Sequence, residues 1–155
     1  KNFPNVKVTN NNFLKTSYAN NNYDMIYCNP PFTYNNDKRF YLNFFFKCCQ
    51  VIQNSSVSTE KTMAFICPSL SERNKNITVD DVIKGMSSKK VDDIYNMLYN
   101  KKPNKNLKKR LLEVDGEDAE KINSLLPDQI QYVGKCVGFG GTGVNAHMYM
   151  CIWVN

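Results

Sequence analysis

The feature that most constrains the fold is a pair of short apolar runs on either side of a helical pattern. The run 23–28, Tyr-Asp-Met-Ile-Tyr-Cys, and the run 62–67, Thr-Met-Ala-Phe-Ile-Cys, have the length and composition of buried strands. Between them, residues 38–52 carry apolar side chains at spacings of three and four, as in a helix that packs on a sheet. Strand, helix and strand of this length predict a right-handed parallel unit in an α/β sheet.

Three further segments have strand patterns. Residues 5–14 are typical of a short strand and its exit. Residues 129–137 and 147–154 are typical of two antiparallel strands, joined by the glycine-rich segment 138–143. The expected sheet is therefore mostly parallel, with a terminal antiparallel hairpin at one edge.

The segment 71–127 differs in texture from the rest of the chain. It is more charged and is interrupted by glycine and proline, with helical spacing over residues 91–99 and 107–126. We expect a helical insertion here, within a single domain that spans residues 1–155.

Composition limits the classes of protein to which the chain can belong. A chain of 155 residues with 42% hydrophobic side chains can build a core, and a net charge of +6 permits an anionic partner such as nucleic acid. The six cysteines lie in or beside apolar runs without paired spacing, which favours reduced core thiols and an intracellular, cytoplasmic or nuclear protein. No apolar stretch reaches the roughly 18–20 residues of a membrane span, and no group of side chains suggests a metal site.

The stiff segment Asn29-Pro30-Pro31-Phe32 follows the first buried strand. Ligands of open parallel sheets bind at the carboxyl ends of strands, where this segment would lie. Proline has no N–H and a fixed φ, so the Pro30 carbonyl is free to point outward, beside the side-chain oxygen of Asn29. Two such acceptors suit the two hydrogens of an amino group, and Phe32 suits a planar base. A plain Pro-Pro turn that ends a strand is the structural alternative.

Residues 23–32 resemble the catalytic motif of S-adenosylmethionine-dependent N6-adenine DNA methyltransferases with an Asn-Pro-Pro-aromatic signature. Residues 61–69 are similar to the next strand of that family, and residues 139–147 to a late hairpin loop that faces the target base. The resemblance implies an incomplete Rossmann-like class I methyltransferase sheet, corresponding to the carboxyl-terminal portion of the catalytic domain. It also implies S-adenosylmethionine as cofactor and DNA as partner, with the target base flipped out of the duplex.

The same resemblance assigns roles to individual residues. Asn29, Pro30, Pro31 and Phe32 would hold the flipped base, with Phe139 on its second face. Tyr34, just past the motif, would shape the pocket, although loop polarity explains it equally well.

The residues expected to bind the cofactor depart from the family pattern. No glycine-rich turn precedes residue 24, and Asn12 stands where the family usually has an aspartate before a Phe-Leu pair. Asn12 and Phe13, together with Asn29, are the candidate cofactor contacts, and an amide acceptor should bind more weakly than a carboxylate. We therefore expect the amino-terminal half, or a partner chain, to complete the sheet.

Two other sets of residues have weaker patterns. Lys108 and Arg110 belong to a basic run that would contact phosphates, or would form a solvated helix face. His147 has no evident cysteine or carboxylate partner, so a packed strand residue is expected.

The leading functional prediction is methyl transfer to adenine N6 in DNA, as in restriction-modification, host defence or viral genome marking. RNA adenine, RNA guanine N2 and a protein glutamine amide present similar amino groups and remain alternatives. A non-catalytic subunit that binds nucleic acid or supports assembly is the alternative from a different class.

Overall fold

The structure is a computed structural model that describes residues 4–18, 22–56, 60–71, 77–136 and 145–154. A short 3-10 helix, η1 (Phe13–Lys15), comes first. In chain order there follow β1 (Met25–Cys28), α1 (Tyr41–Gln53), β2 (Lys61–Cys67), α2 (Val79–Lys84), α3 (Ser88–Tyr99), α4 (Leu107–Leu112), α5 (Glu117–Leu125), β3 (Gln129–Lys135) and β4 (His147–Trp153). The predicted helix and strands around residues 23–67 and the two late strands are confirmed.

The four strands form one mixed sheet in the order β1-β2-β4-β3. β1 pairs with β2 in parallel, with Met25 opposite Thr62 and Cys28 opposite Phe65. β4 lies between β2 and β3 and is antiparallel to both. The α/β class and the antiparallel hairpin are confirmed, but a mostly parallel sheet is wrong for the pairings among the described strands. β1, β2 and β3 all run in the same direction. β4 runs the opposite way and lies between β2 and β3, so both of its pairings are antiparallel.

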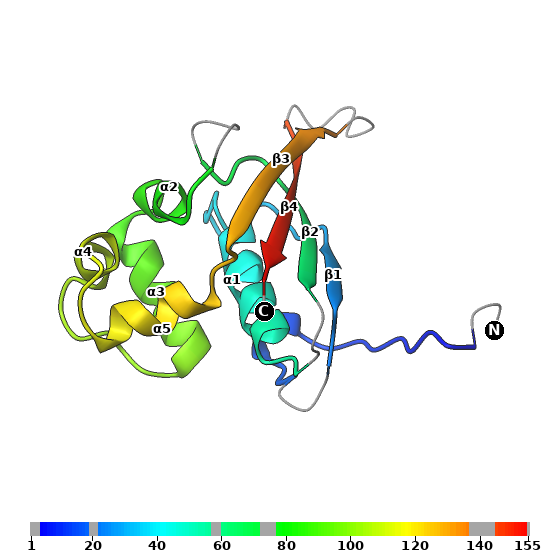
Figure 1. Cartoon of the computed structure of the whole chain (residues 1–155), viewed down its shortest axis with the longest axis horizontal. Helices are drawn as coiled ribbons and strands as arrows, with labels where there is room; N and C mark the ends of the chain where they lie inside the picture. The colour runs from blue at the N-terminus through cyan, green and yellow to red at the C-terminus, as the bar shows by residue number, and fades with distance from the viewer. Residues whose placement is uncertain (1–3, 19–21, 57–59, 72–76, 137–144, 155) are drawn as a thin grey trace.

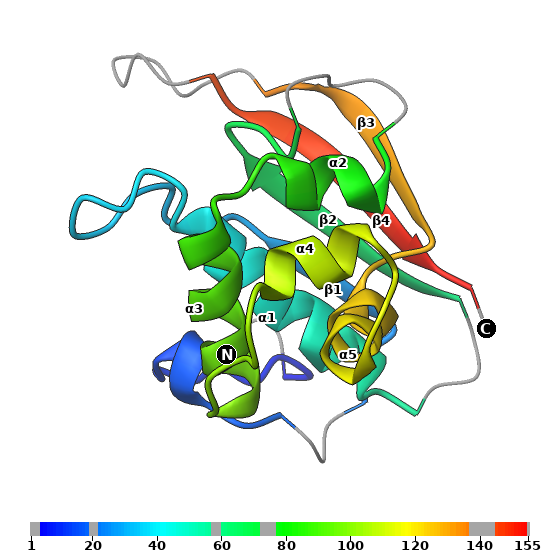
Figure 2. The same cartoon turned by 90° about the vertical axis from the view of Figure 1, so that its left-hand side faces the viewer.

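The helices cover one face of the sheet (Figures 1 and 2). α1 lies directly on the strands because its apolar positions recur on one side, and α2 to α5 pack outside it. Phe45 of α1 is fully buried and meets Phe65 of β2 edge-on, with ring centroids 5.2 Å apart. Trp153 of β4 is buried against α5 and donates from Nε1 to the Leu125 carbonyl at 3.0 Å.

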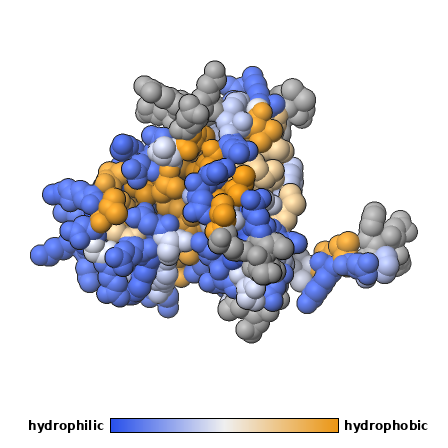
Figure 3. Space-filling view, in the orientation of Figure 1, coloured by the Kyte–Doolittle hydropathy of each residue, from blue (hydrophilic) through white to orange (hydrophobic). Residues whose placement is uncertain are grey.

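The opposite face of the sheet has no helix on it in the described part of the chain. Met25 and Tyr27 of β1 alternate with inward-facing residues and are 53% and 62% exposed. The strand register places Ala64 and Met150 on the same face as Tyr27. Pale orange and orange side chains follow the strands at the right-hand margin of the body in Figure 3. Ala64 is 4% exposed, so the part of this face that is available to another polypeptide segment lies on β1, at Met25, Tyr27 and the free edge of the strand.

The predicted strand at residues 5–14 is wrong. Residues 5–12 form no strand, Val8 is 87% exposed, and only Phe13–Lys15 take up regular structure, as η1. The alternating Val6 and Val8 fit a strand, but a strand needs a neighbour to satisfy its backbone groups. In Figure 1 this segment runs away from the body of the protein.

The described residues of the segment 71–127 contain the helices α2 to α5, with one difference from the predicted helical pattern. The pattern over 107–126 forms two helices, α4 and α5, instead of one. Val114 has φ 53° and Gly116 has φ 93°, so the backbone between them leaves the right-handed helical region. Within the described residues, no helix is both long enough and apolar enough to cross a membrane.

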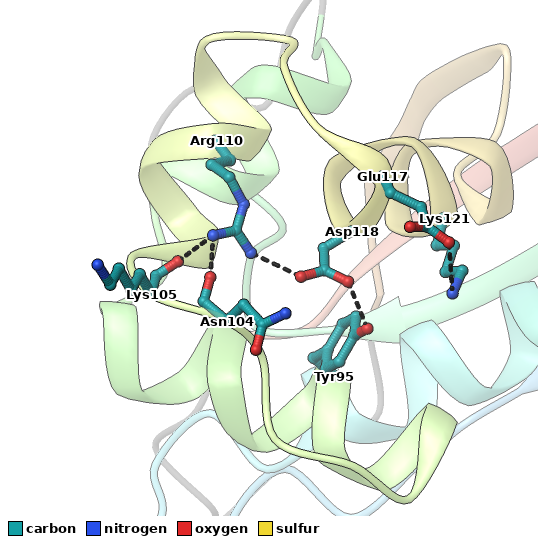
Figure 4. A network of polar contacts seen from close by, with 7 residues as sticks. All are labelled: Tyr95, Asn104, Lys105, Arg110, Glu117, Asp118 and Lys121. Atoms are coloured by element: carbon teal, nitrogen blue, oxygen red, sulfur yellow. Dashed lines mark hydrogen bonds and ion pairs between the residues drawn. The ribbon is translucent and has the colours of Figure 1, made fainter.

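A half-buried carboxylate ties these helices together (Figure 4). The Tyr95 hydroxyl of α3 donates to Asp118 Oδ1 at 2.7 Å, and Arg110 of α4 pairs with Asp118 Oδ2 at 2.7 Å. The hydrogen bond from Tyr95 holds the pKa of Asp118 below its ordinary value, with a further contribution from Arg110. Burial, together with the bond to Asp118, raises the pKa of Tyr95 to about 12. Asp118 is therefore ionised, and Tyr95 neutral, at neutral pH.

We expect Asp118→Asn to reduce the acid sensitivity of the fold. Because the pKa of Asp118 is lowered on folding, its stabilising contribution is complete above the unfolded value of about 3.9 and is lost as the pH falls through the lower folded value. Urea midpoints measured between neutral pH and pH of about 3 should fall more steeply for the wild type than for Asp118→Asn. Asp115→Asn is the control, since Asp115 is exposed and its side chain bonds to no described residue. Equal slopes for the wild type and Asp118→Asn would contradict the assignment.

Candidate functional site

The candidate site lies at one edge of the sheet, where β1 and β2 end. Asn29–Phe32 follow β1, and Pro68 and Ser69 follow β2. Because β4 is antiparallel, its first residue, His147, lies opposite Cys67 and Lys135 at the same edge. The segments that carry the Asn-Pro-Pro-Phe signature and the end of the second buried strand are thus brought together, as the sequence pattern predicts.

The four signature residues differ in burial. Asn29 and Pro31 are exposed, Pro30 is buried, and Phe32 is half-buried. The Asn29 amide bonds to no side chain or backbone group in the described part of the chain. The Phe32 ring meets the Tyr41 ring edge-on, with centroids 6.4 Å apart and planes at 79°. The segment therefore presents an exposed amide next to a buried proline and a half-buried aromatic ring.

A tight turn follows the signature. Tyr34 and Asp37 exchange two backbone hydrogen bonds, at 3.1 and 2.8 Å, around Asn35 and Asn36. Both asparagines have positive φ, 47° and 66°, as in a type I′ turn, and asparagine is one of the few residues that tolerate this conformation. Tyr34 is exposed on this turn, with its ring 5.1 Å from that of Phe40. The turn holds the backbone of Tyr34, two residues after Phe32, and leaves the Tyr34 ring accessible to a ligand.

An ion pair anchors the turn to the helical layer. The Lys90 ammonium of α3 contacts Asp37 Oδ2 and donates to Asn43 Oδ1 of α1 at 2.9 Å. The Lys90 side chain is 10% exposed and that of Asp37 is 34% exposed. A lysine buried to this degree needs both partners, because an unpaired buried charge is costly. The pair therefore couples the position of the turn to the position of α3.

Arg39 makes a second connection from the same turn. Its backbone N–H donates to Asp37 Oδ1 at 3.0 Å, and its Nη1 donates to the Gly85 carbonyl at the end of α2. Its Nε is buried and has no partner among the described residues. Arg39 is thus largely committed to holding the turn against α2.

Two neutral phenols support the loop that follows β2 at this edge of the sheet. The Tyr41 hydroxyl donates to the Ser69 carbonyl at 2.7 Å, and the Tyr149 hydroxyl accepts from the Leu70 N–H at 3.3 Å. Burial raises the pKa of Tyr41 above its ordinary value, and it raises the pKa of Tyr149 to about 12. At neutral pH both groups act as hydrogen-bonding supports for the loop after β2, and neither is a base.

A row of aromatic rings connects the two predicted binding segments. Phe13 of η1 stacks on Phe44 of α1 with centroids 5.7 Å apart, Phe44 lies 5.6 Å from Phe40, and Phe40 contacts Tyr34. The predicted cofactor segment and the turn after the signature therefore lie on the same side of the first turns of α1. The row gives this side of the site a continuous apolar surface.

Asn12 already has an intramolecular role. Its Oδ1 accepts from the Leu14 N–H at 3.1 Å, and its carbonyl accepts from the Thr16 hydroxyl at 2.7 Å, so it caps η1. A cofactor amino group would share this oxygen with the cap. The described residues thus fit S-adenosylmethionine only in part: Asn29 is free, Asn12 is partly engaged, and no glycine-rich turn precedes β1.

Comparison with protein-family models, with curated proteins and with solved structures gives no match for this chain. What the site can do follows from its own groups: an exposed amide at Asn29, the half-buried ring of Phe32 and the exposed ring of Tyr34. These groups suit a planar ligand with an amino group. A separate polar hollow of about 570 Å³ lies between residues 14–18, α1 and α3, and residues 29–34 do not line it.

The predicted phosphate contacts are turned toward the protein. Lys108 donates to the carbonyls of Lys84 and Met86, and Arg110 donates to the carbonyls of Asn104 and Lys105 besides its bond to Asp118. Exposed side chains of the same basic run, at Lys101, Lys102, Lys105 and Lys109, are better placed to meet a phosphate backbone. Phe139 lies outside the described residues.

Several residues that support the candidate site cannot be identified from the sequence pattern. Lys90 and Asp37 are 53 positions apart, and Tyr41 meets Ser69 across α1 and β2. His147 packs on β4 as expected but is also bonded through Nδ1 to the Tyr132 hydroxyl at 2.7 Å. Among the described residues, no cluster of three or more histidine, cysteine or acidic side chains is arranged to hold a metal ion. Only the high density of aromatic residues in the sequence around Phe40 indicates a structured surface after the signature.

Proposed function

We propose that this chain is the target-base half of an S-adenosylmethionine-dependent amino-methyltransferase that acts on N6 of adenine in DNA. The observation that carries the proposal is the exposed, unpartnered Asn29 amide next to buried Pro30 and half-buried Phe32, at the carboxyl end of β1. The basic net charge of +6 favours a nucleic acid over a free nucleoside.

The chain's own residues would orient the amino group. Asn29 Oδ1 accepts one N–H of the extruded adenine and the Pro30 carbonyl accepts the other, so the nitrogen lone pair is directed out of the ring plane. Phe32 and Tyr34 contact the faces of the base, and the Lys90–Asp37 pair holds the turn that carries Tyr34. S-adenosylmethionine, when bound, supplies the electrophilic methyl group.

The proposal requires a complementary polypeptide segment. The described residues lack a glycine-rich cofactor turn, and Met25, Tyr27 and the free edge of β1 have no cover among them. A segment that pairs with β1 and packs on Met25 and Tyr27 would cover this surface and would supply the cofactor turn. Size-exclusion of the chain by itself should show concentration-dependent association, and a monomer at all concentrations would count against this requirement.

Incorporation of labelled methyl groups tests the function. The chain, combined with the segment that completes its cofactor site, is incubated with methyl-labelled S-adenosylmethionine and with double-stranded DNA, RNA or protein. Label in DNA that appears as N6-methyladenine is expected. Label in RNA or in protein glutamine, with none in DNA, would keep the amino-group chemistry and overturn the substrate.

A non-catalytic subunit that binds nucleic acid is the second candidate. It is favoured by Asn12, whose side-chain oxygen serves the cap of η1 and lacks the charge that would strengthen a cofactor bond. Calorimetric titration of the completed assembly with S-adenosylmethionine separates the two candidates. Binding in the micromolar range supports the enzyme, and absence of binding together with retained DNA affinity supports the subunit.

A further inference from the structure

The polar hollow on the helical side of the protein is separate from the candidate site. It is formed by residues 14–18, the carboxyl-terminal half of α1 and the end of α3, and its volume is about 570 Å³. This volume lies within the range of small-molecule sites, roughly 300–1,000 Å³. Residues 29–34 are not part of its lining. The hollow is therefore large enough for a small organic ligand of its own.

The charged side chains of the hollow are both cationic. Lys15 of η1 and Lys47 of α1 line it, and the described residues of its lining include no acidic side chain. Lys47 is half-buried, and its Nζ donates to the neutral Oε1 of Gln50 at 3.4 Å. None of the ion pairs among the described residues includes Lys47. Because a partly buried ammonium without a counter-charge is costly, an anion in the hollow would be stabilised.

Neutral hydrogen-bonding groups surround the two lysines. Gln50 Nε2 donates to the Leu98 carbonyl at 3.1 Å and so fixes this wall between α1 and α3. Both helices end at the hollow, where Asn54 and Asn100 are their C-caps, and Ser17 lies beside them in the lining. Carbonyls of a last helical turn accept hydrogen bonds from ligands, and each helix end contributes about half a negative charge. The two ammonium groups outweigh these helix ends, so the hollow combines an anion site with acceptors for hydroxyl groups.

We propose that the hollow binds a small sugar phosphate, with the phosphate between Lys15 and Lys47 and the sugar hydroxyls against the two helix ends. A phosphate monoester carries a charge of about −1.5 to −2 at neutral pH, which matches two ammonium groups, whereas a single carboxylate would match one. Hydroxyl groups both donate and accept, as carbonyl and amide neighbours require. The Tyr18 ring, which lies against Phe13 with centroids 5.5 Å apart, adds an apolar contact for the sugar. This binding does not depend on methyl transfer.

Titration of the full chain with α-glucose 1-phosphate, followed by amide NMR shifts, tests the site. We expect saturable shifts in residues 14–18 and 96–100. Methyl α-glucoside lacks the phosphate and inorganic phosphate lacks the sugar, so each should bind at least about tenfold more weakly. Because the second pKa of a phosphate monoester is about 6, the affinity should fall as the pH is lowered from about 7.5 to about 5.5. Inorganic phosphate that binds as tightly as α-glucose 1-phosphate would overturn the assignment of a sugar phosphate.

Substitutions of the two lysines locate the phosphate. Lys15→Met and Lys47→Met should each weaken binding at least about tenfold, whereas Lys89→Met, at an exposed lysine in the first turn of α3, should not change it. Burial lowers the pKa of Lys47, and bound phosphate should raise it again, as measured by NMR of its side chain. Unchanged affinity in both variants, absence of saturable shifts, or shifts confined to residues 29–34 would overturn the proposal. If Lys47→Met alters the unfolding curve followed by Trp153 fluorescence, Lys15→Met decides alone, because Lys15 is exposed.

Discussion

Under the proposed methyltransferase function, replacing Asn29 with alanine in the completed assembly is expected to lower the rate of methyl transfer by at least about a hundredfold, while the fold is retained. The size follows from the loss of one pre-oriented hydrogen-bonding group, which typically costs about 10²–10³ in rate. The fold should survive because Asn29 is exposed and its side chain bonds to no described residue. Labelled-methyl incorporation measures the rate, and urea unfolding measures the stability.

Two further variants make this result specific. Asn29→Asp keeps an acceptor oxygen at the same position and should retain more activity than Asn29→Ala. Asn96→Ala is the matched control, since Asn96 is an exposed asparagine of α3 that is not part of the signature segment. Full activity of Asn29→Ala, or an equal loss in Asn96→Ala, would contradict the assigned role of the Asn29 amide.

Replacing Lys90 with methionine is expected to lower the free energy of unfolding by about 2 kcal/mol, less than the roughly 3–5 kcal/mol of a fully buried pair because Asp37 is partly exposed. Methionine keeps the apolar stem of lysine but removes the donor to Asp37 Oδ2 and to the Asn43 amide oxygen. The turn that carries Tyr34 should also lose its fixed position, so activity falls with stability. The single tryptophan, Trp153, is buried against α5 and provides a fluorescence signal for urea unfolding.

A surface pair provides the matched comparison. Lys109 and Glu113 are spaced i,i+4 on α4 at 4.0 Å and are mostly exposed, so Lys109→Met should change the free energy of unfolding by less than about 0.5 kcal/mol. In a double-mutant cycle, Asp37→Asn and Lys90→Met should be non-additive, because the two residues share one interaction. Additive effects, or equal losses at Lys90 and Lys109, would show that the Lys90–Asp37 pair does not anchor the turn.

The sequence predicts the elements whose patterns are local. The run 23–28, the helix after it and the run 62–67 differ clearly in period and are separated by Pro30 and Pro31 and by a polar loop, so β1, α1 and β2 agree with the prediction within a few residues. The hairpin of β3 and β4 is predicted for the same reason. The edge of the sheet that carries Asn29 then follows from the direction of the strands.

Elements that depend on distant partners are predicted less well. Val6 and Val8 alternate as in a strand, but pairing is a property of two segments and no described strand is their neighbour. Val114 has no helix-breaking character, so only the left-handed backbone around Gly116 reveals that α4 and α5 are separate. The position of β4 between β2 and β3 is likewise a long-range outcome.

The candidate site also combines residues that a local pattern predicts with residues that depend on distant partners. Asn29 and Phe32 are identified from their own short signature, whereas the pair Lys90–Asp37 joins segments that nothing in the sequence connects. Lys108 and Arg110 are basic by sequence, yet their donors are used by backbone carbonyls of neighbouring loops. Residue type therefore predicts which side chains can bind, and the fold decides which of them are available.

The placement of β4 has a consequence for how the protein is assembled during synthesis. β3 is made before β4 but, within the described sheet, it pairs along its length only with β4. A nascent chain that has emerged through β3 can form the β1–α1–β2 unit, but its third strand must wait without a ladder partner. The sheet therefore closes in one late step, when β4 leaves the ribosome, and until then β2 and β3 each expose an unpaired edge that a chaperone would need to shield.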